Sequence, residues 1–363
     1  MNLRCSVCQR AYPLHTQEWR CECEGIFELE GTSTFSRDAI EADVPTLWRY
    51  RAMLPIHDEE DIVSLGEGFT PLVPVSLYGL TVLCKLEFLA PTGSFKDRGA
   101  AVLVSVLRGM GVAEVVEDSS GNAAASLAAY CARAGIRARI FVPAHASPAK
   151  LAQIAVYGAE LVPVEGPREN SALAAQEAAK TAYYASHNHS PFFVQGTKTF
   201  AYEVWEHLGG GAPRNLVLPV GNGSLLMGAY RGFSELQAAG LLERMPRLFA
   251  VQSEACAPIY QAYRQGLDDA RPVSPGETIA EGIRIAQPSR GSQVLRAVRE
   301  TAGAVATVDD REIEDARSML ARLGLYVEPT SATAVAALRK LDRTIAPDEI
   351  TVIPLTGSGL KTT

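Results

Sequence analysis

Apolar residues along this chain follow two spacings that alternate from about residue 80 to the C-terminal end. Short runs rich in β-branched residues predict strands, and between them apolar residues recur at the spacing of a helix face. The runs cover residues 112–116, 137–142, 161–164, 215–220, 248–252 and 350–354. The helical stretches cover residues 100–107, 122–134, 147–157, 169–184, 225–239, 309–323 and 331–341. Such alternation is typical of an α/β protein in which helices cover parallel sheets.

Helix ends are marked by particular residues. Gly135 and Gly158 follow two of the predicted helices, and glycine is the residue that most readily adopts the left-handed conformation after a helix. The helical stretch 147–157 begins with Ser147 and Pro148, which suit the N-cap and the first helical position.

Composition limits what kind of protein this is. The chain has 363 residues, 47% of them hydrophobic and 21% charged, which excludes disorder. At about 150 residues per domain, two domains are expected. The 41 acidic and 34 basic residues give a net charge of −7 without a basic patch, so nucleic acid is not an expected partner. No run approaches the roughly 18 apolar residues of a membrane span, and no secretory signal opens the chain, so we expect a cytoplasmic protein acting on a small molecule.

Ligands of parallel-sheet proteins bind where strands lead into helices, and three such loops carry polar groups. Residues 117–122 read Glu-Asp-Ser-Ser-Gly-Asn, residues 219–224 read Pro-Val-Gly-Asn-Gly-Ser, and residues 355–360 read Leu-Thr-Gly-Ser-Gly-Leu. The first two fit anion sites, since backbone N–H groups at a helix start or in a glycine-rich turn attract negative charge. The third offers a hydroxyl at a strand end. Each loop also has an interpretation without a ligand. The same residues occur in an N-cap for the first loop, in a tight turn for the second and in an ordinary loop for the third.

A lysine with altered chemistry is predicted at position 96. Residues 91–99 read Pro-Thr-Gly-Ser-Phe-Lys-Asp-Arg-Gly and run into the helical stretch 100–107. A helix N-terminus and the neighbouring Arg98 both lower an amine's pKa. Schiff-base chemistry requires such an amine. A solvated surface lysine is the alternative.

Together these segments resemble the fold-type II pyridoxal-phosphate enzymes, and within them the threonine synthase family. The resemblance covers about residues 60–363. The matching segments are residues 66–72 (G-E-G-F-T-P-L), 91–99, 119–122, 150–153 (K-L-A-Q), 157–159 (Y-G-A), 219–223 and 356–361 (T-G-S-G-L-K). The motifs P-T-G-S-F-K-D-R-G and T-G-S-G-L-K together are highly specific.

The resemblance implies a role for each matching position. Lys96 would hold the cofactor covalently and act as the base, with Phe95 packed near the cofactor. Thr356 would donate to the pyridine nitrogen. Asn122 would bond the cofactor's 3′ oxygen and contribute to the substrate site, in which Ser119 and Ser120 would hold the carboxylate. The cofactor phosphate would be bound by backbone N–H groups of Gly221, Asn222, Gly223, Ser224 and Leu225.

The resemblance also implies a fold. It predicts two three-layer parallel-sheet domains: a large cofactor domain of residues 36–90 and 200–363, and a smaller mobile domain of residues 91–199 that carries Lys96. Residues 1–35 would form a separate small segment. A homodimer is expected on the same ground.

Two positions depart from the threonine synthase pattern. Phe193 stands where we match the arginine that meets the substrate phosphate, and Ala123 replaces a common threonine. Losing a charge-assisted phosphate contact is a serious loss, so another cation must replace it or the substrate differs. The candidate cations are Arg284, Arg290 and Lys198, and Lys198 is also the rival to Lys96 as the cofactor lysine.

Four of the seven cysteines, Cys5, Cys8, Cys21 and Cys23, lie within 19 residues at the N-terminus. Four thiolates suit a tetrahedral structural zinc, and the segment resembles the zinc ribbon of some archaeal and bacterial threonine synthases. The second pair is C-x-C, so a redox pair or simply reduced cysteines are the alternatives. Cys84, Cys131 and Cys256 are read as reduced core thiols, and His15 as an incidental polar residue.

Three functions follow. The first is a threonine synthase-like lyase that converts O-phosphohomoserine and water to threonine and phosphate. The second keeps Lys96 and the cofactor but performs β-replacement or β-elimination, as an amino-acid synthase or a serine/threonine dehydratase does, on another hydroxy amino acid, with or without a phosphate. Phe193 and Ala123 favour it. The third is a non-catalytic zinc-ribbon binding protein, against which the intact Lys96 motif and the acidic charge argue.

Overall fold

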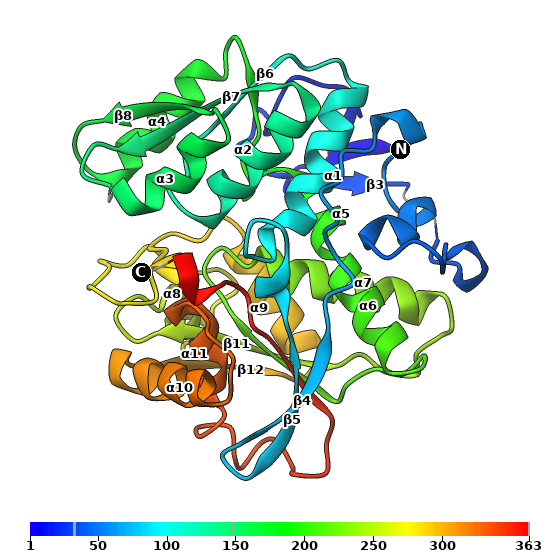
Figure 1. Cartoon of the computed structure of the whole chain (residues 1–363), viewed down its shortest axis with the longest axis vertical. Coiled ribbons are helices and arrows are strands. Elements are labelled where there is room, and N and C mark those ends of the chain that lie inside the picture. The colour runs from blue at the N-terminus through cyan, green and yellow to red at the C-terminus, as the bar shows by residue number, and fades with distance from the viewer. Residues whose placement is uncertain (32–33, 147, 362–363) are drawn as a thin grey trace. The chain divides into compact units, whose positions relative to one another are not determined.

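The structure is a computed structural model that describes residues 1–31, 34–146 and 148–361 (Figure 1). The chain forms two compact units, each built from two stretches of sequence. Unit 1 comprises residues 1–68 and 96–197, and unit 2 comprises residues 69–95 and 198–363. Among the described residues, no helix is both long and apolar enough to cross a membrane.

Unit 1 contains a parallel sheet of four strands in the order β8-β7-β6-β9. These strands are β6 (Glu114–Glu117), β7 (Arg137–Pro143), β8 (Glu160–Val164) and β9 (Tyr183–Tyr184). Its helices are α1 (Lys96–Gly109), α2 (Asn122–Ala134), α3 (Pro148–Val156), α4 (Arg168–Ala178) and α5 (Pro191–Thr197). Helices α2 and α4 pack on β7, and α3 packs on β8 (Figure 1).

A second, antiparallel sheet of unit 1 is formed at the N-terminus. Its strands are β1 (Asn2–Cys5), β2 (Ala11–Pro13) and β3 (Phe27–Glu30), in the order β2-β1-β3. Leu3, Phe27 and Leu29 of this sheet belong to the same hydrophobic core as Phe192 of α5 and the apolar residues of α1 and α2. The N-terminal segment is therefore part of the core of unit 1.

Unit 2 contains a sheet of six strands in the order β12-β11-β10-β13-β5-β4. These strands are β4 (Leu72–Leu77), β5 (Leu80–Lys85), β10 (Asn215–Pro219), β11 (Arg247–Ser253), β12 (Ala304–Val308) and β13 (Thr351–Pro354). All neighbouring pairs are parallel except the hairpin β4–β5.

The helices of unit 2 form two groups around this sheet. They are α6 (Thr199–His207), α7 (Ser224–Ala238), α8 (Pro258–Arg264), α9 (Gly291–Glu300), α10 (Asp310–Arg322) and α11 (Pro329–Ala337). Val217, Phe249 and Val251 share a core with α10 and α11. Because successive strand residues point to opposite faces, the alternate residues of β10 and β11 face away from α10 and α11. Helices α7 and α9, which contact each other and β11, form the second group.

The structure confirms the α/β class and the predicted strands and helices to within a few residues. Gly135 ends α2 in the left-handed conformation with φ of +73°, as predicted. One prediction is wrong: residues 169–184 are not a single helix, because α4 ends at Ala178 and Tyr183–Tyr184 pair with β6 as an edge strand. A two-residue strand is too short to show alternation, so its apolar residues read as a helix continuation. The N-cap predicted at Ser147 lies outside the described residues.

The predicted domain limits differ from the two units in several places. Residues 1–35, which we expected as a separate segment, belong to unit 1, and residues 91–95 and 198–199, which we assigned to the smaller domain, belong to unit 2. Residues 36–68, which we assigned to the large domain, belong to unit 1 together with residues 96–197. In that stretch Glu67 is buried and accepts hydrogen bonds from Trp48 Nε1 at 2.6 Å and from Tyr130 of α2 at 2.8 Å. These bonds attach the stretch to α2. That residues 91–199 move as a domain stays a prediction.

Helices α1 and α5 approach each other so closely that only glycine fits between them. A Cβ at Gly196 would lie 1.9 Å from the carbonyl oxygen of Arg98 and 2.8 Å from the Cα of Gly99. We therefore expect Gly196→Ala to lower the free energy of unfolding by about 4 kcal/mol or more, because backbone atoms have to separate. Urea denaturation measures this loss. Gly211→Ala is the control, since its Cβ would meet its nearest atom at 3.4 Å. Equal stability of both variants would contradict the prediction.

Candidate active site

Lys96 is the first residue of α1, as the motif predicts. The residues just before it are attached to the loop after β13: the Phe95 N–H donates to the Thr356 carbonyl at 3.0 Å, and Ser94 bridges to Gly357. Within unit 1, the Lys96 Nζ lies 5.7 Å from the centroid of the Phe193 ring. The chain thus runs from residues bonded to the Thr356 loop directly into the helix start that carries Lys96.

Phe193 occupies a packed position beside α1. Its side chain is 2% exposed, and its ring lies so close to Gly99 that a Cβ there would come within 2.4 Å of it. An apolar ring therefore fills the position that we matched, from the sequence, to a phosphate-binding arginine.

The loop after β6 leads into α2 at Asn122. The Ser119 Oγ accepts the Gly121 N–H at 3.2 Å, so this hydroxyl shapes the loop. Ser120 and Asn122 are half-buried, and Ser119 is buried. The three predicted substrate-binding residues therefore lie together in one loop at the carboxyl end of β6.

The sequence motifs predict no role for two further residues at this loop, Glu117 and His187. Glu117, the last residue of β6, is 1% exposed and bonds His187 Nδ1 through Oε1 at 2.7 Å. Its other oxygen accepts the Ser119 N–H at 2.8 Å. Burial raises the pKa of Glu117 to about 7, and burial followed by the charge of Lys96 lowers the pKa of His187 well below its usual value. The sequence offered one signal for Glu117: it is an acidic residue at the end of a buried strand, directly before a predicted ligand loop.

The neighbouring carboxyl group is also paired. Asp118 accepts a hydrogen bond from the Tyr184 hydroxyl at 2.6 Å. Burial, followed by the charge of Glu117, raises the pKa of Asp118. Buried carboxyl groups in a ligand loop are typical of functional sites.

Lys198, the rival cofactor lysine, has a different partner. Its side chain is 0% exposed and its Nζ lies 2.9 Å from Glu235 Oε2 of α7. Burial lowers its pKa to about 8, while Glu235 acts in the opposite direction. Lys198 thus forms a buried ion pair inside unit 2 and belongs to the packing of α6 and α7.

The glycine-rich loop between β10 and α7 is the predicted phosphate cradle. Gly223 has a φ of +88°, and a Cβ there would lie 2.3 Å from Val294. A Cβ at Gly221 would lie 3.0 Å from Ile285 and 3.1 Å from the Cα of Ile283. Among the described residues, no protein acceptor takes the N–H groups of Gly221, Asn222 or Gly223.

This cradle fits a cofactor phosphate. Ser224 and Leu225 continue it as the first residues of α7, a helix of 15 residues whose N-terminal end favours an anion. The Asn222 side chain is turned to the protein, since its Oδ1 accepts the Ser289 N–H at 3.1 Å. Backbone donors therefore remain for a ligand.

Thr356 is 2% exposed and its hydroxyl lies 2.9 Å from the Ser331 hydroxyl of α11. Ser331 Oγ in turn lies 3.2 Å from the Gly357 carbonyl oxygen and accepts the Gly357 N–H at 2.8 Å. The Thr356 hydroxyl is thereby oriented by a second hydroxyl, as suits a donor to a heterocyclic nitrogen.

The cations proposed to replace the missing arginine are in unit 2. Arg284 is partly exposed, 4.0 Å from Glu277. Arg290 is buried at the start of α9 and donates to Gln293 at 3.0 Å. In unit 1, the charges of Lys96 and Arg168 act on both Glu117 and His187.

The predicted cofactor residues are divided between the units. Lys96 and Asn122 belong to unit 1, and Phe95, the cradle and Thr356 belong to unit 2. The step from Phe95 to Lys96 is one of three places at which the chain passes from one unit to the other.

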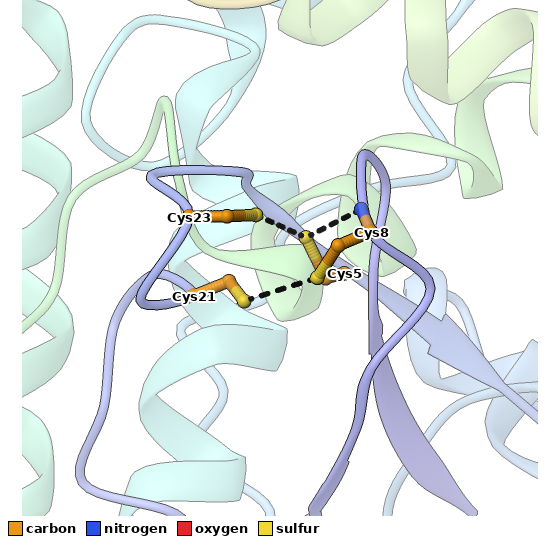
Figure 2. Close-up of side chains that lie close together, drawn as sticks. All are labelled: Cys5, Cys8, Cys21 and Cys23. Carbon is orange, nitrogen blue, oxygen red and sulfur yellow. Dashed lines mark hydrogen bonds between the residues drawn. The ribbon is translucent and has the colours of Figure 1, made fainter.

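The four N-terminal cysteines form a cluster. Their sulfur atoms all lie within 4.8 Å of one another, and Figure 2 shows the side chains turned toward a common point. Cys5 and Cys23 are 3.4 Å apart, Cys8 and Cys21 3.5 Å. Four sulfurs bound to one zinc at about 2.3 Å would be about 3.8 Å apart, so this arrangement fits a tetrahedral ion. The C-x-C spacing is thus compatible with a four-thiolate site. Cys84, Cys131 and Cys256 are buried and free, as predicted.

Comparison with known proteins agrees with the site. Residues 63–357 match the family described as "Pyridoxal-phosphate dependent enzyme". The chain is 35% identical to the threonine synthase of Methanocaldococcus jannaschii and 33% identical to that of Methanosarcina acetivorans, covering 99% of this chain and 92% of each relative. Among solved structures, the threonine deaminase of T.th. is similar, with a TM-score of 0.68 and 26% identity, covering 80% of this chain and 92% of that one.

The family match spans the Lys96 motif, the Ser-Ser-Gly-Asn loop, the glycine-rich cradle and Thr356. The likeness to the two archaeal relatives extends over nearly the whole chain. The chain therefore belongs to the pyridoxal-phosphate dependent enzyme family, as a lyase homologous to the threonine synthases.

Proposed function

We propose that this protein converts O-phosphohomoserine and water to threonine and phosphate. The observation that carries the proposal is the likeness to named threonine synthases over 99% of the chain. The cradle, the Thr356 hydroxyl and Lys96 at a helix start support it as well, because they supply what a phosphorylated pyridine cofactor and an acid–base amine need.

Each residue has a distinct task in this reaction. Bound pyridoxal phosphate supplies the electron-accepting ring that makes the substrate's α-proton acidic. The Lys96 amine removes that proton and then moves protons at the substrate side chain. Ser119 and Ser120 bind the substrate carboxylate. Gly221, Asn222, Gly223, Ser224 and Leu225 hold the cofactor phosphate, Thr356 donates to the ring nitrogen, Asn122 bonds the 3′ oxygen and Phe95 packs on the ring.

A second candidate is elimination or replacement at Cβ of a hydroxy amino acid that carries no phosphate. Phe193 favours it, because a buried ring offers no charge to a phosphate leaving group. Glu117 favours this second candidate too. The charge of Lys96 acts on the Glu117 carboxyl group, and this carboxyl group, when ionised, repels a phosphate bound near Lys96.

Phosphate release and threonine formation from O-phosphohomoserine test the first proposal directly. For the cofactor-loaded enzyme we expect equal amounts of both products, with serine and threonine giving no keto acid. Keto acid from serine or threonine, without phosphate release from O-phosphohomoserine, would instead establish the second candidate. Inertness toward all three substrates would contradict both.

The cysteine cluster is proposed to hold one structural Zn²⁺ through Cys5, Cys8, Cys21 and Cys23. The sulfur positions support four thiolate ligands, which is the coordination of a closed structural site. A homodimer and a cytoplasmic location are further parts of the proposal. Sedimentation of the loaded enzyme tests the dimer.

A further inference from the structure

Glu117 and His187 form an acid–base pair in unit 1. The His187 Nδ1 lies 2.7 Å from Glu117 Oε1, and the other carboxyl oxygen is bonded to the Ser119 N–H. The Glu117 side chain is 1% exposed, whereas that of His187 is 13% exposed. Among the described residues, the His187 Nε2 has no hydrogen-bond partner. The pair therefore has a buried end at Glu117 and an open end at Nε2.

The groups around the pair adjust its protonation. The Ser119 N–H acts on Glu117 by a hydrogen bond. The charged groups that act on the pair are Asp118, Lys96 and Arg168. Burial raises the pKa of Glu117 to about 7 and lowers that of His187, so the imidazole is neutral when the carboxyl group titrates. One proton thus enters or leaves the pair near neutral pH.

One aromatic ring, that of Phe193, lies near both the pair and the reacting lysine. The His187 and Phe193 ring centroids are 5.9 Å apart, and the Lys96 Nζ is 5.7 Å from the centroid of the Phe193 ring. Lys96 also acts electrostatically on both members of the pair. Phe193 thus lies against both the lysine and the histidine, without supplying a charge of its own.

We propose that Glu117 and His187 transfer the proton of the water that is added to, or lost from, the substrate's Cβ. This proposal rests on the proposed function, in which Lys96 moves the protons on the substrate's carbon atoms and a second group acts at the water. An imidazole backed by a carboxyl group is suited to that task, because the carboxyl group orients the ring and balances the charge it gains.

The proton transfer balances in both directions. When water adds, its oxygen lone pair forms the bond to Cβ, its O–H bond breaks and the proton passes to His187 Nε2. The electron pair that Cβ gives up would pass into the conjugated system that pyridoxal phosphate supplies when it is bound at Lys96. When water is lost, the Cβ–O bond breaks with its electrons on oxygen, which takes a proton from Nε2. The pair thus serves either candidate reaction, because the oxygen concerned is the Cβ hydroxyl of the product in the first and of the substrate in the second.

Two variants separate this role from that of Lys96. Glu117→Gln removes the titrating carboxyl group, and His187→Asn keeps a donor near the Nδ1 position but lacks Nε2. We expect either change to slow incorporation of isotopically labelled water oxygen at Cβ by about 10²-fold or more. Exchange of the α-proton of threonine in deuterated water, which depends on Lys96, should stay within about threefold of the wild-type rate.

His189→Asn is the matched control. The ring of His189 lies 3.2 Å from the Ser186 hydroxyl, and its centroid lies 5.0 Å from that of Trp19. Both of these partners are outside the Glu117–His187 pair. The labelled-oxygen rate of this variant should stay close to that of the wild type.

The pH dependence gives a second readout. Water addition needs a pair that can accept a proton, so its rate falls as the pH drops below about 7, the pKa of Glu117. Water loss needs a pair that already holds the proton, so its rate falls as the pH rises above this value. Glu117→Gln should abolish either dependence, which the loss of a merely structural residue would not do.

Two outcomes would overturn the proposal. Unchanged oxygen incorporation in both variants would show that another group handles the water. A parallel loss of oxygen incorporation and α-proton exchange would show that the pair only positions Lys96. Failure of the proposed function is recognised separately, because wild-type enzyme would then incorporate no labelled oxygen from water when it is given O-phosphohomoserine.

Discussion

Lys96→Ala is expected to abolish turnover and the visible absorbance of covalently bound cofactor together. One amine both holds the cofactor and moves the substrate's protons in the proposed reaction, so its removal should lower turnover by about 10⁴-fold or more. Absorbance spectra of the loaded protein, and α-proton exchange of threonine in deuterated water, measure the two losses. The fold should survive, since Lys96 is only the first residue of α1.

Lys198→Met provides the contrasting result. This change removes the buried amine that pairs with Glu235. Glu235 retains its other ion-pair partner, Arg231, whose Nε lies 3.1 Å from Glu235 Oε1. We expect a loss of about 3 kcal/mol in stability with the cofactor absorbance retained. Lys180→Ala, a change of an exposed lysine, controls for the loss of a positive charge. Bound cofactor in Lys96→Ala and none in Lys198→Met would reverse the assignment of the two lysines.

Removing the metal from the cysteine cluster is expected to destabilise the whole of unit 1. Cys5 and Cys21 belong to the same hydrophobic core as Phe192 of α5 and the apolar residues of α1. Structural zinc contributes on the order of 10 kcal/mol to the folding of small ribbons. A chelator, or Cys5→Ser, should therefore lower the Tm by more than about 10 °C. The measured zinc content should fall in parallel, from one Zn²⁺ per chain to none.

Activity should fall as well, because the segment between the cysteine pairs is linked through Tyr184 to the loop that follows β6. Trp19 packs edge-on against Tyr184 at 4.9 Å, and the Tyr184 hydroxyl bonds Asp118, next to Glu117. A change of tryptophan fluorescence should accompany metal loss. Cys256→Ala, which alters a buried thiol outside the cluster, should retain its metal. A metal-free protein with full stability would refute the zinc site.

Much of the fold was predictable from local pattern. Strands such as β7 and β11 are largely apolar runs because both faces of a parallel sheet are buried, and Gly135 marks the end of α2 because it adopts the left-handed conformation. β9 was missed for the opposite reason: two residues at a sheet edge carry no period, and only pairing with Val115 and Val116 makes them a strand.

The candidate site divides in the same way. Lys96, Asn122, Gly221 and Thr356 lie in short motifs, whose chemistry depends on a helix start or a glycine turn that a few neighbouring residues determine. Glu117 and His187 are separated by 70 residues, and no local pattern joins them. Their contact exists because β6 and β9 are neighbours in the sheet, which brings the chain after each strand to the same edge.

The sequence by itself thus determined the family, the candidate cofactor lysine and the candidate cysteine ligands, since these depend on residue type and short spacing. Only the tertiary structure decided that Lys198 is a buried ion-pair residue, because Glu235 reaches it from another helix. It likewise decided that Phe193 is packed against α1, and that a buried carboxyl group and a histidine are bonded to each other in unit 1. Such properties arise from burial and from contacts between distant residues, which a linear pattern does not contain.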